Sequence, residues 1–240
     1  MRIVWILLLL ALAQTVSATT PPDGFVARYH LSVESMPIGE TERKLERLPN
    51  GDYLYSTRSY ATGVAAVLMK DRIGEQSRFR FQKGRFQPLD YRYERNGGKK
   101  TRTRNAHFDW SAMRAEGEHD GEAWQLAVKP GVLDRLLYQL AASYDLQRQR
   151  KRFSYPVVDR GELKTYELTM AGVETVDTPL GSLTALKLQR RDGEYETTLW
   201  MAKELAYLPV RIEHTEDGKR YRAELKTLSG LTPARHAKAR

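Results

Sequence analysis

GVLDRLLYQLAASYDLQR, from Gly131 to Arg148, is the one long stretch of this chain whose apolar residues recur at helical spacing. These residues follow steps of one, three and four, which places them on one stripe of a helix: Val132, Leu133, Leu136, Leu137, Leu140, Ala141 and Tyr144. Pro130 suits a first helical position, although no Ser, Thr, Asp or Asn cap stands beside it. A lone amphipathic helix needs an apolar surface to cover. In a chain whose other segments indicate strands, that surface is one side of a sheet.

Tight turns divide the rest of the chain. Asn-Gly and Asp-Gly pairs, which supply the positive φ that a tight hairpin requires, stand at 50–51, 96–97, 120–121, 192–193 and 217–218. Lys83-Gly84 and Thr178-Pro179-Leu180-Gly181 add two further turns. Strands joined in this way are antiparallel neighbours.

Between the turns, apolar and polar residues alternate with the period of a half-buried strand, as in Phe25 to Val33 and Tyr221 to Lys226. One sheet face is therefore apolar and the other charged. The turns and alternation together predict about a dozen strands in two meanders, 25–128 and 152–228, joined by the helix. The predicted fold is mainly β: a strongly curved antiparallel sheet or incomplete barrel with one amphipathic helix packed on its concave side.

The first eighteen residues have the layout of a secretory signal. Arg2 precedes an apolar core from Ile3 to Leu12, and Val16-Ser17-Ala18 forms a small-residue cleavage pattern. We expect cleavage after Ala18, because the apolar part is short for a membrane anchor, so the remaining chain is not expected to be an integral membrane protein. Residues 19–230 are then one antiparallel β domain, and residues 231–240 are a disordered basic tail.

Charge and cysteine content narrow the chemistry. The chain has no cysteine, which excludes disulfides, thiolate metal sites and cysteine nucleophiles. Its formal net charge is +9, and the excess of basic residues is concentrated in one meander between residues 78 and 104. This meander is either a solvated sheet face or a site for anionic head groups or polyanions. The head-group candidates are Arg78, Arg80, Arg102 and Arg104.

No recognised motif for catalysis, metal or cofactor binding is present. His119 lies among carboxylates around the 120–121 turn, where charged residues are ordinarily solvated. His107 and Asp109 lack the strained Gly-x-Ser-x-Gly nucleophile turn, and there is no phosphate-binding glycine loop or dinucleotide fingerprint. We therefore predict no catalytic residue, metal or cofactor. A carboxylate pair for glycoside chemistry stays open, because its spacing is spatial and not sequential.

Aromatic residues and arginines interleave between Phe79 and Tyr93, a pattern that single-strand nucleic-acid binders share. At a spacing of two, these rings are more simply the core face of a sheet. No nucleic-acid partner is predicted.

The segment 61–69, ATGVAAVLM, is uncharged and too short for a stable free helix. It is either a buried strand or turn, or an apolar flap over an opening. If it is a flap and the space beneath the helix is a pocket, the residues expected to line that pocket are Val64, Val67, Leu68, Trp124, Leu133, Leu137 and Trp200.

Several segments, in order, resemble a known family: Lys83 to Pro88 followed by Tyr91, Phe108-Asp109, Leu133 to Leu137, Thr178 to Gly181, Leu199 to Met201 and Leu208 to Glu213. They are similar to the bacterial envelope proteins grouped as domain of unknown function 3108. The resemblance implies a periplasmic, mostly β protein and no established activity. The end of the chain, from Trp200 through Leu205 to Val210, is also loosely similar to the periplasmic lipoprotein carriers, whose half-open barrel wraps a helix and holds acyl chains.

The leading hypothesis is a non-catalytic periplasmic binding protein or carrier for an amphiphile, such as a lipid, an acyl chain or a glycolipid. An apolar concavity beside a basic face would suit an anionic head group. One alternative is a hydrolase of envelope glycans, and another is a structural partner of envelope proteins with no small ligand.

Overall fold

The computed structural model describes residues 21–231 except 69, 98–100, 194 and 217. The strands are β1 (Gly24–Val33), β2 (Met36–Arg47), β3 (Tyr53–Ala61), β4 (Arg72–Gln82), β5 (Arg85–Asn96), β6 (Arg102–Asp109), β7 (Arg114–His119), β8 (Glu122–Ala127), β9 (Leu133–Asp134), β10 (Phe153–Asp159), β11 (Glu162–Thr178), β12 (Gly181–Asp192), β13 (Tyr195–Ala202), β14 (Leu208–Glu216) and β15 (Lys219–Ser229). The helices are α1 (Ala65–Leu68), α2 (Leu137–Gln147) and the 3-10 turn η1 (Lys203–Leu205).

All fifteen strands belong to one sheet in the order β8-β7-β6-β5-β4-β3-β2-β1-β15-β14-β13-β12-β11-β10-β9. Successive strands pair antiparallel across the turns that the sequence predicts, and β9 with β10 is the parallel pair. The two predicted meanders meet where β1 pairs with β15. That long-range pairing makes one continuous sheet, and the prediction of a mainly antiparallel β fold is confirmed.

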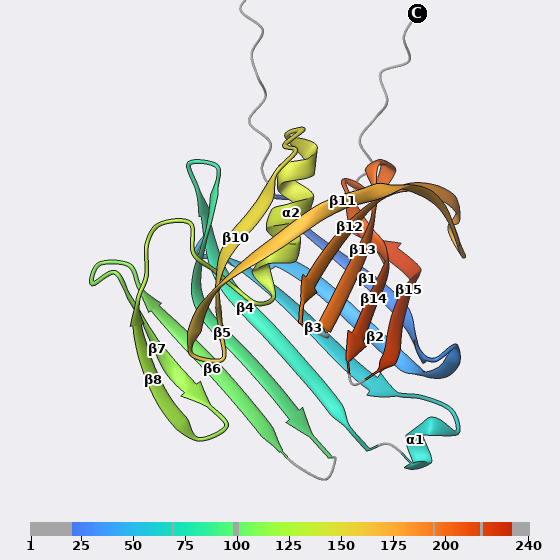
Figure 1. Ribbon diagram of the computed structural model, residues 1–240, viewed down its shortest axis with the longest axis horizontal. Helices are drawn as coiled ribbons and strands as arrows, with labels where there is room; N and C mark the ends of the chain where they lie inside the picture. The colour runs from blue at the N-terminus through green and yellow to red at the C-terminus, as the bar shows by residue number, and fades with distance from the viewer. Residues whose placement is uncertain (1–20, 69, 98–100, 194, 217, 232–240) are drawn as a thin grey trace, which may run out of the picture.

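The sheet is open and strongly curved, and α2 lies on its concave side (Figure 1). Most of the helix is buried, including the side chains of Ala142 and Ser143 outside the predicted stripe. Gln139 accepts a 2.6 Å hydrogen bond from Arg43 Nη1 on β2, and Gln147 donates to the carbonyl of Ala206 at 3.1 Å. The helix is therefore enclosed on more sides than an amphipathic stripe predicts, because the sheet curves around it.

The predicted helix start at Gly131 is wrong, and the reason is local. Leu133 and Asp134 pair with β10 as a short strand, and the helix begins only at Leu137. The carboxylate of Asp134 accepts hydrogen bonds from the amides of Leu136 (2.9 Å) and Leu137 (2.8 Å). It thereby satisfies two of the amides that a helix N-terminus leaves free. No capping side chain stands beside Pro130, because the carboxylate that satisfies these amides is that of Asp134, three residues after Gly131.

The edge strand β8 approaches the turn between β10 and β11, close to the other edge of the sheet. Gly161 in that turn has φ 77°. A Cβ on Gly161 would lie 2.7 Å from Cγ of Trp124 on the edge strand β8. The backbone passes so close to the indole that glycine is required here for space as well as for conformation. This packing contact brings β8 close to the β10–β11 turn, although no strand pairing joins β8 to β10 or β11 among the described residues.

Gly161→Ala should therefore be markedly more harmful than Gly121→Ala. Gly121 also has positive φ, in the β7–β8 turn, but a Cβ there would meet nothing within 4 Å. We expect Gly121→Ala to cost about 1 kcal/mol, from backbone strain alone. Gly161→Ala should cost about 2–4 kcal/mol, because overpacking against Trp124 is added. Urea unfolding of both variants measures the two losses of stability, and equal losses would show that Trp124 does not crowd a side chain at position 161.

Two predicted segments lie largely outside the described residues. The signal region 1–18 is one, and residues 232–240 of the basic tail are the other; Leu231, the first residue of that tail, packs against the core. Within the described ranges, no helix is long and apolar enough to span a bilayer.

Candidate anion-binding cavity

The concave side of the sheet has an apolar half and a polar half. In the apolar half, α2 packs against rings such as Phe81 and Phe86, and the hollow left between the helix, Phe25 and Leu208 has a volume of only about 20 Å³. That is room for about one water molecule and not for an acyl chain. The polar half contains a cavity of about 330 Å³, lined by Tyr93, Arg95, Arg102, Arg104, Arg135, Asp159, Arg160, Lys164, Tyr166, Arg190, Asp192, Gly193, Tyr195, His214 and Glu216.

These side chains lie on the concave face of the sheet because side chains alternate between the two faces along each strand. On β5 and β6, Tyr93 and Arg104 are register partners and share the face of the buried pair Tyr91 and Ala106. On β12 and β13, Arg190 pairs with Thr197, which shares the face of buried Leu199. Because side chains on one face repeat every second residue, the apolar lining beside α2 continues into an arginine-rich lining further along the same strands.

Arg104 and Arg190 are the most distinctive residues of the cavity. Arg104 is 8% exposed, and its guanidinium lies 4.7 Å from the centre of the Tyr93 ring. The Arg190 side chain is 12% exposed and lies 4.0 Å from the centre of the Tyr166 ring, and its Nη1 contacts Oδ2 of Asp192 at 3.4 Å. Nε of each arginine is buried, and the described residues provide it with no hydrogen-bond partner. Buried donors are normally paired, so both groups are suited to an acceptor brought by a ligand.

Arg135, by contrast, is neutralised within the protein. Its guanidinium lies 3.2 Å from Oδ1 of Asp159 and 3.8 Å from Oε1 of Glu75. Burial acts to lower the pKa of Arg135, but these two carboxylates raise it above its ordinary value. The pKa of Asp159 is lowered despite its burial, because Arg135 and a 2.9 Å hydrogen bond from Tyr166 favour the carboxylate. Arg135 thus holds the cavity wall together and contributes little free charge.

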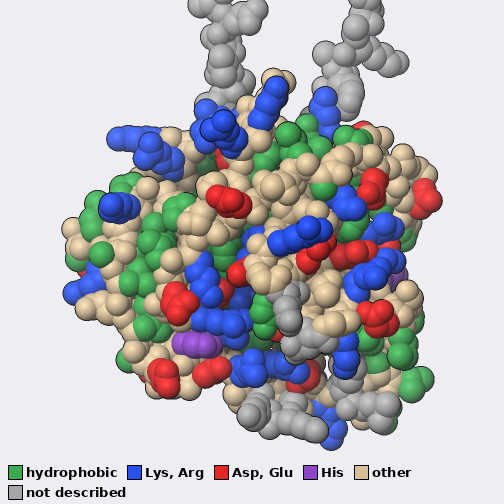
Figure 2. Space-filling view, viewed as in Figure 1, with side chains coloured by type: hydrophobic (Ala, Val, Ile, Leu, Met, Phe, Trp, Pro, Cys, Tyr) green, Lys and Arg blue, Asp and Glu red, His purple; other side chains and the backbone are tan. Residues whose placement is uncertain are grey.

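The remaining lining is strongly cationic. Arg102, Arg104, Arg160, Lys164 and Arg190 line it, and the carboxylates that remain on the lining are Asp192 and Glu216. Arg190 is paired with Asp192 at 3.4 Å and Lys164 with Glu162 at 3.3 Å, so the excess positive charge comes from Arg102, Arg104 and Arg160. Burial, together with nearby Arg135 and Arg190, lowers the pKa of His214, so this imidazole is neutral at neutral pH. Figure 2 shows Lys and Arg side chains gathered near the middle of this face of the molecule. Guanidinium groups bind phosphates and carboxylates through paired N–H donors, and a partly enclosed cavity strengthens that attraction.

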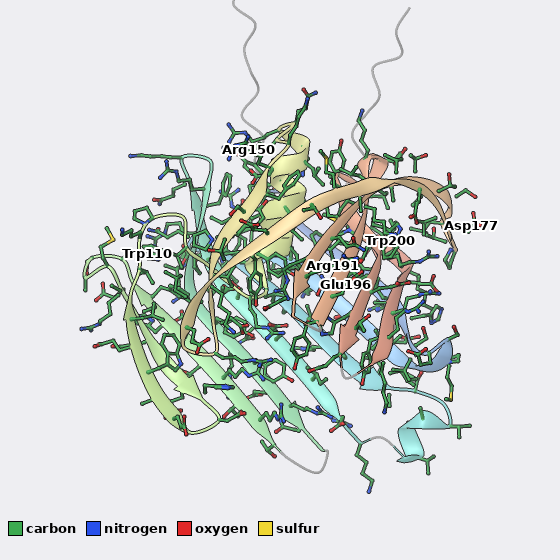
Figure 3. The ribbon with its side chains drawn as sticks, in the orientation of Figure 1. Trp110, Arg150, Asp177, Arg191, Glu196 and Trp200 are labelled. Atoms are coloured by element: carbon green, nitrogen blue, oxygen red, sulfur yellow. The ribbon has the colours of Figure 1, made fainter. Side chains whose placement is uncertain are left out.

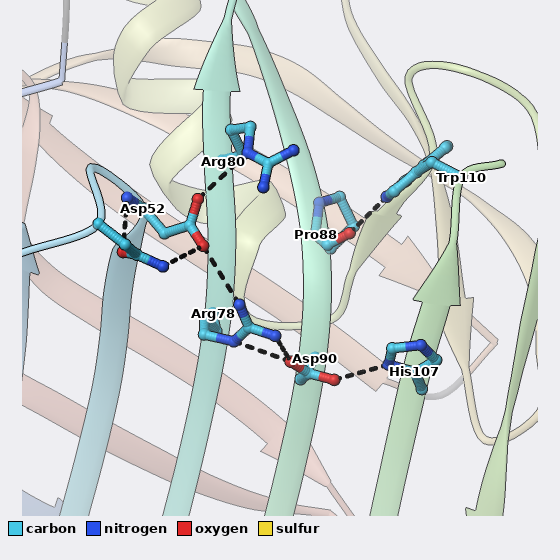
Figure 4. Close-up of polar contacts among 8 residues, drawn as sticks. Asp52, Arg78, Arg80, Pro88, Asp90, His107 and Trp110 are labelled. Atoms are coloured by element: carbon cyan, nitrogen blue, oxygen red, sulfur yellow. Dashed lines mark hydrogen bonds and ion pairs between the residues drawn. The ribbon is translucent and has the colours of Figure 1, made fainter. Parts of the chain in front are cut away.

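Of the four predicted head-group arginines, two line this cavity and two do not. Arg102 and Arg104 face inward, whereas Arg78 and Arg80 lie on the convex face, where both contact Asp52 at 3.2 Å (Figure 4). Arg78 also forms an ion pair with Asp90, which contacts His107 Nδ1 at 2.8 Å. The convex arginines are therefore engaged in a network of surface ion pairs.

The predicted apolar pocket is not assembled. Val64 and Val67 are exposed at and next to α1, and the side chain of Leu68 lies outside the described residues. Leu133 and Leu137 are buried in the core beside α2. Trp124 covers Gly161 at the edge of the sheet, whereas Trp200 lies among β12 to β14 (Figure 3), with its Nε1 donating to Glu174 at 2.8 Å. These residues occupy separate places, because an apolar stretch can be exposed at a turn as easily as it can line a pocket.

Sequence reasoning missed Arg135, Arg160, Lys164, Tyr166 and Arg190. Arg190 follows the buried residue Leu188 at a spacing of two, which is a usable signal that it shares the inner face. What the sequence does not show is that β12 and β6 line the same cavity.

An open, curved antiparallel sheet that surrounds one helix and keeps a cationic cavity defines this chain as a β-barrel-like protein. The chain belongs to the family of proteins of unknown function DUF3108, whose model matches residues 28–226. The predicted family is thereby confirmed. No curated protein matches the sequence.

Two solved structures are similar to this chain at 9% identity. The β-barrel-like protein of domain of unknown function DUF1849 from Brucella abortus has a TM-score of 0.57, with 88% of this chain and 98% of that chain covered. MucB in complex with MucA(peri) covers 89% of this chain and 94% of that chain, but its TM-score of 0.17 carries no argument. The first similarity supports the fold alone.

Proposed function

We propose that this protein is a non-catalytic binding protein or carrier of the bacterial periplasm, whose ligand is an amphiphile held by its anionic head group. The observation that carries the proposal is the pair of buried guanidiniums, Arg104 and Arg190, whose Nε atoms have no partner among the described residues. The apolar half of the concave side is filled by α2, so the ligand's chain would remain outside the barrel. Recognition of the head group is the part of the carrier hypothesis that the geometry supports best.

Titration with a short-chain soluble lipid tests this proposal. The chain from Thr19 onward should bind dihexanoyl phosphatidylglycerol saturably and dihexanoyl phosphatidylcholine much more weakly, because only the first has a net negative charge. Arg104→Ala and Arg190→Ala should each weaken binding about tenfold or more, since each removes charge-assisted hydrogen bonds worth about 1.5–3 kcal/mol. Isothermal titration calorimetry at two salt concentrations gives the affinity and shows how far added salt weakens it by screening the charges.

Arg78→Ala is the matched control, because it removes the same charge from the convex face. It should leave the affinity unchanged. A flat titration of the parent protein with the anionic lipid, or an equal loss in Arg78→Ala, would contradict the cavity as the binding site.

The periplasmic location is tested separately. We expect protein recovered from the periplasm to begin at Thr19, because Val16-Ser17-Ala18 is a cleavage pattern. N-terminal sequencing decides the point. Recovery of a chain that retains Met1 in the membrane fraction would contradict the proposed location.

A further inference from the structure

The mouth of the cavity and α1 lie at the same end of the barrel. In an antiparallel meander, alternate connections share one end. The connections at this end are β1–β2, β3–β4, β5–β6, β7–β8, β10–β11, β12–β13 and β14–β15. Arg102, Asp192 and Glu216 of the cavity stand at the strand ends beside these connections. The β3–β4 connection contains α1, at the lower right of Figure 1. The C-terminal part of α2 and the η1 turn lie together at the opposite end.

Large apolar side chains are exposed at the end where the cavity opens. Val64 is 83% exposed and Val67 is 75% exposed, one helical turn apart, since the Val67 amide donates to the Val64 carbonyl at 3.2 Å. Other exposed apolar side chains close to connections at this end are Met36, Tyr60, Leu163, Tyr195 and Tyr221. Protruding aliphatic side chains of this kind are a feature of surfaces that meet a membrane or a protein.

Cationic side chains stand beside these valines. A hollow of about 840 Å³ next to α1 is lined by Arg58, Lys70 and Arg72, which are all exposed. The acidic residues of the same hollow are engaged with other arginines, Asp71 with Arg95 at 2.7 Å and Glu94 with Arg92. Aliphatic side chains that enter the acyl region while arginines and lysines contact phosphates are the usual arrangement of a peripheral membrane contact.

We propose that the α1 end of the barrel is a docking surface for an anionic lipid bilayer, with Val64 and Val67 inserting and Arg58, Lys70 and Arg72 contacting phosphates. The proposal rests on the proposed function in one respect: docking by this end turns the mouth of the arginine cavity toward the lipid head groups. The ligand of the cavity would then be the head group of a membrane lipid and not a free anion.

Vesicle co-sedimentation tests the docking surface. The chain from Thr19 onward should sediment with phosphatidylcholine vesicles that contain phosphatidylglycerol and much less with pure phosphatidylcholine vesicles, and added salt should weaken the association. Val64→Asp combined with Val67→Asp should reduce the partition coefficient about tenfold or more, because two aliphatic insertions are lost and two negative charges are added. Val173→Asp is the matched control, since Val173 is 63% exposed on β11 and lies away from α1.

The outcomes separate this inference from the proposed function. The double valine variant should still bind dihexanoyl phosphatidylglycerol in solution, because its cavity is intact. Sedimentation of that variant like the parent, a comparable loss in Val173→Asp, or no sedimentation of the parent would overturn the docking surface and favour a protein partner at this end. A flat titration with the soluble lipid would instead overturn the cavity, whatever the vesicles show.

Discussion

Leu136→Asp should leave little folded protein at room temperature. Leu136 is 2% exposed at the start of α2, and its amide donates to Asp134. An aspartate there would bury a second carboxylate beside the first and remove the apolar contacts of the leucine. The expected cost is several kcal/mol, comparable with the whole stability of a typical domain, about 5–15 kcal/mol. Circular dichroism during urea unfolding measures the loss.

Leu180→Asp is the control for the chemical change itself. Leu180 lies in the β11–β12 turn and is 46% exposed, so the same substitution should change stability by less than about 0.5 kcal/mol. A Leu136→Asp variant that unfolds at the same urea concentration as the parent would show that α2 is not packed in the concave side.

Asp134 should make the protein less stable as the pH rises from mildly acidic to mildly alkaline. Its side chain is fully buried, and burial raises its pKa to about 7, although hydrogen bonds from Ser77, Leu136 and Leu137 act to lower it. The Ser77 hydroxyl donates to Oδ2 of Asp134 at 2.5 Å. In the unfolded chain the carboxyl has an ordinary pKa of about 3.9. At a pH between these two pKa values, Asp134 is protonated in the folded state and ionised in the unfolded state, so the folded state binds more protons.

The sign of the effect follows directly. Stability falls with rising pH wherever the folded state binds the extra proton, so the contribution of Asp134 is fully present below about pH 4 and is lost as the pH rises to about 7. Asp134→Asn keeps the acceptor for the helix amides but cannot ionise. Each unit of pKa shift is worth about 1.4 kcal/mol, so from pH 5 to pH 8 the variant should lose about 3 kcal/mol less stability than the parent.

Ser77→Ala supplies the complementary test. Removing the hydroxyl deletes a hydrogen bond that favours the Asp134 carboxylate, so the pKa of Asp134 should rise further and the loss of stability should extend to higher pH. Urea unfolding at pH 5, 7 and 8 for the parent and both variants measures these slopes. Parallel slopes in the parent and Asp134→Asn would contradict a raised pKa in the folded state.

Part of the cavity could be predicted from the sequence. The excess of basic residues between 78 and 104 indicated four head-group arginines, of which Arg102 and Arg104 line the cavity, whereas Arg78 and Arg80 lie on the convex face. Which face of the sheet a side chain takes depends on the register in which its strand pairs with its neighbours. Arg78 and Arg80 alternate with Phe79 and Phe81, and Arg78 lies opposite Asp90, which pairs with His107. Arg102 and Arg104 instead share the side of β6 on which Ala106 and Phe108 are buried, so the arginines of β4 and β6 face opposite sides of the sheet.

The sequence by itself determined the elements and their local order: the period of two, the Gly-containing turns, the one long helix and the antiparallel hairpins between neighbours. These features depend on residues a few positions apart, whose conformational preferences act locally. Only the tertiary structure decided that β1 pairs with β15, that Asp134 caps α2 from a strand beside β10, and that Arg104 and Arg190 line one cavity. Those contacts join residues far apart in the chain. They depend on sheet curvature and register, which the whole set of strand pairings fixes together and no single segment encodes.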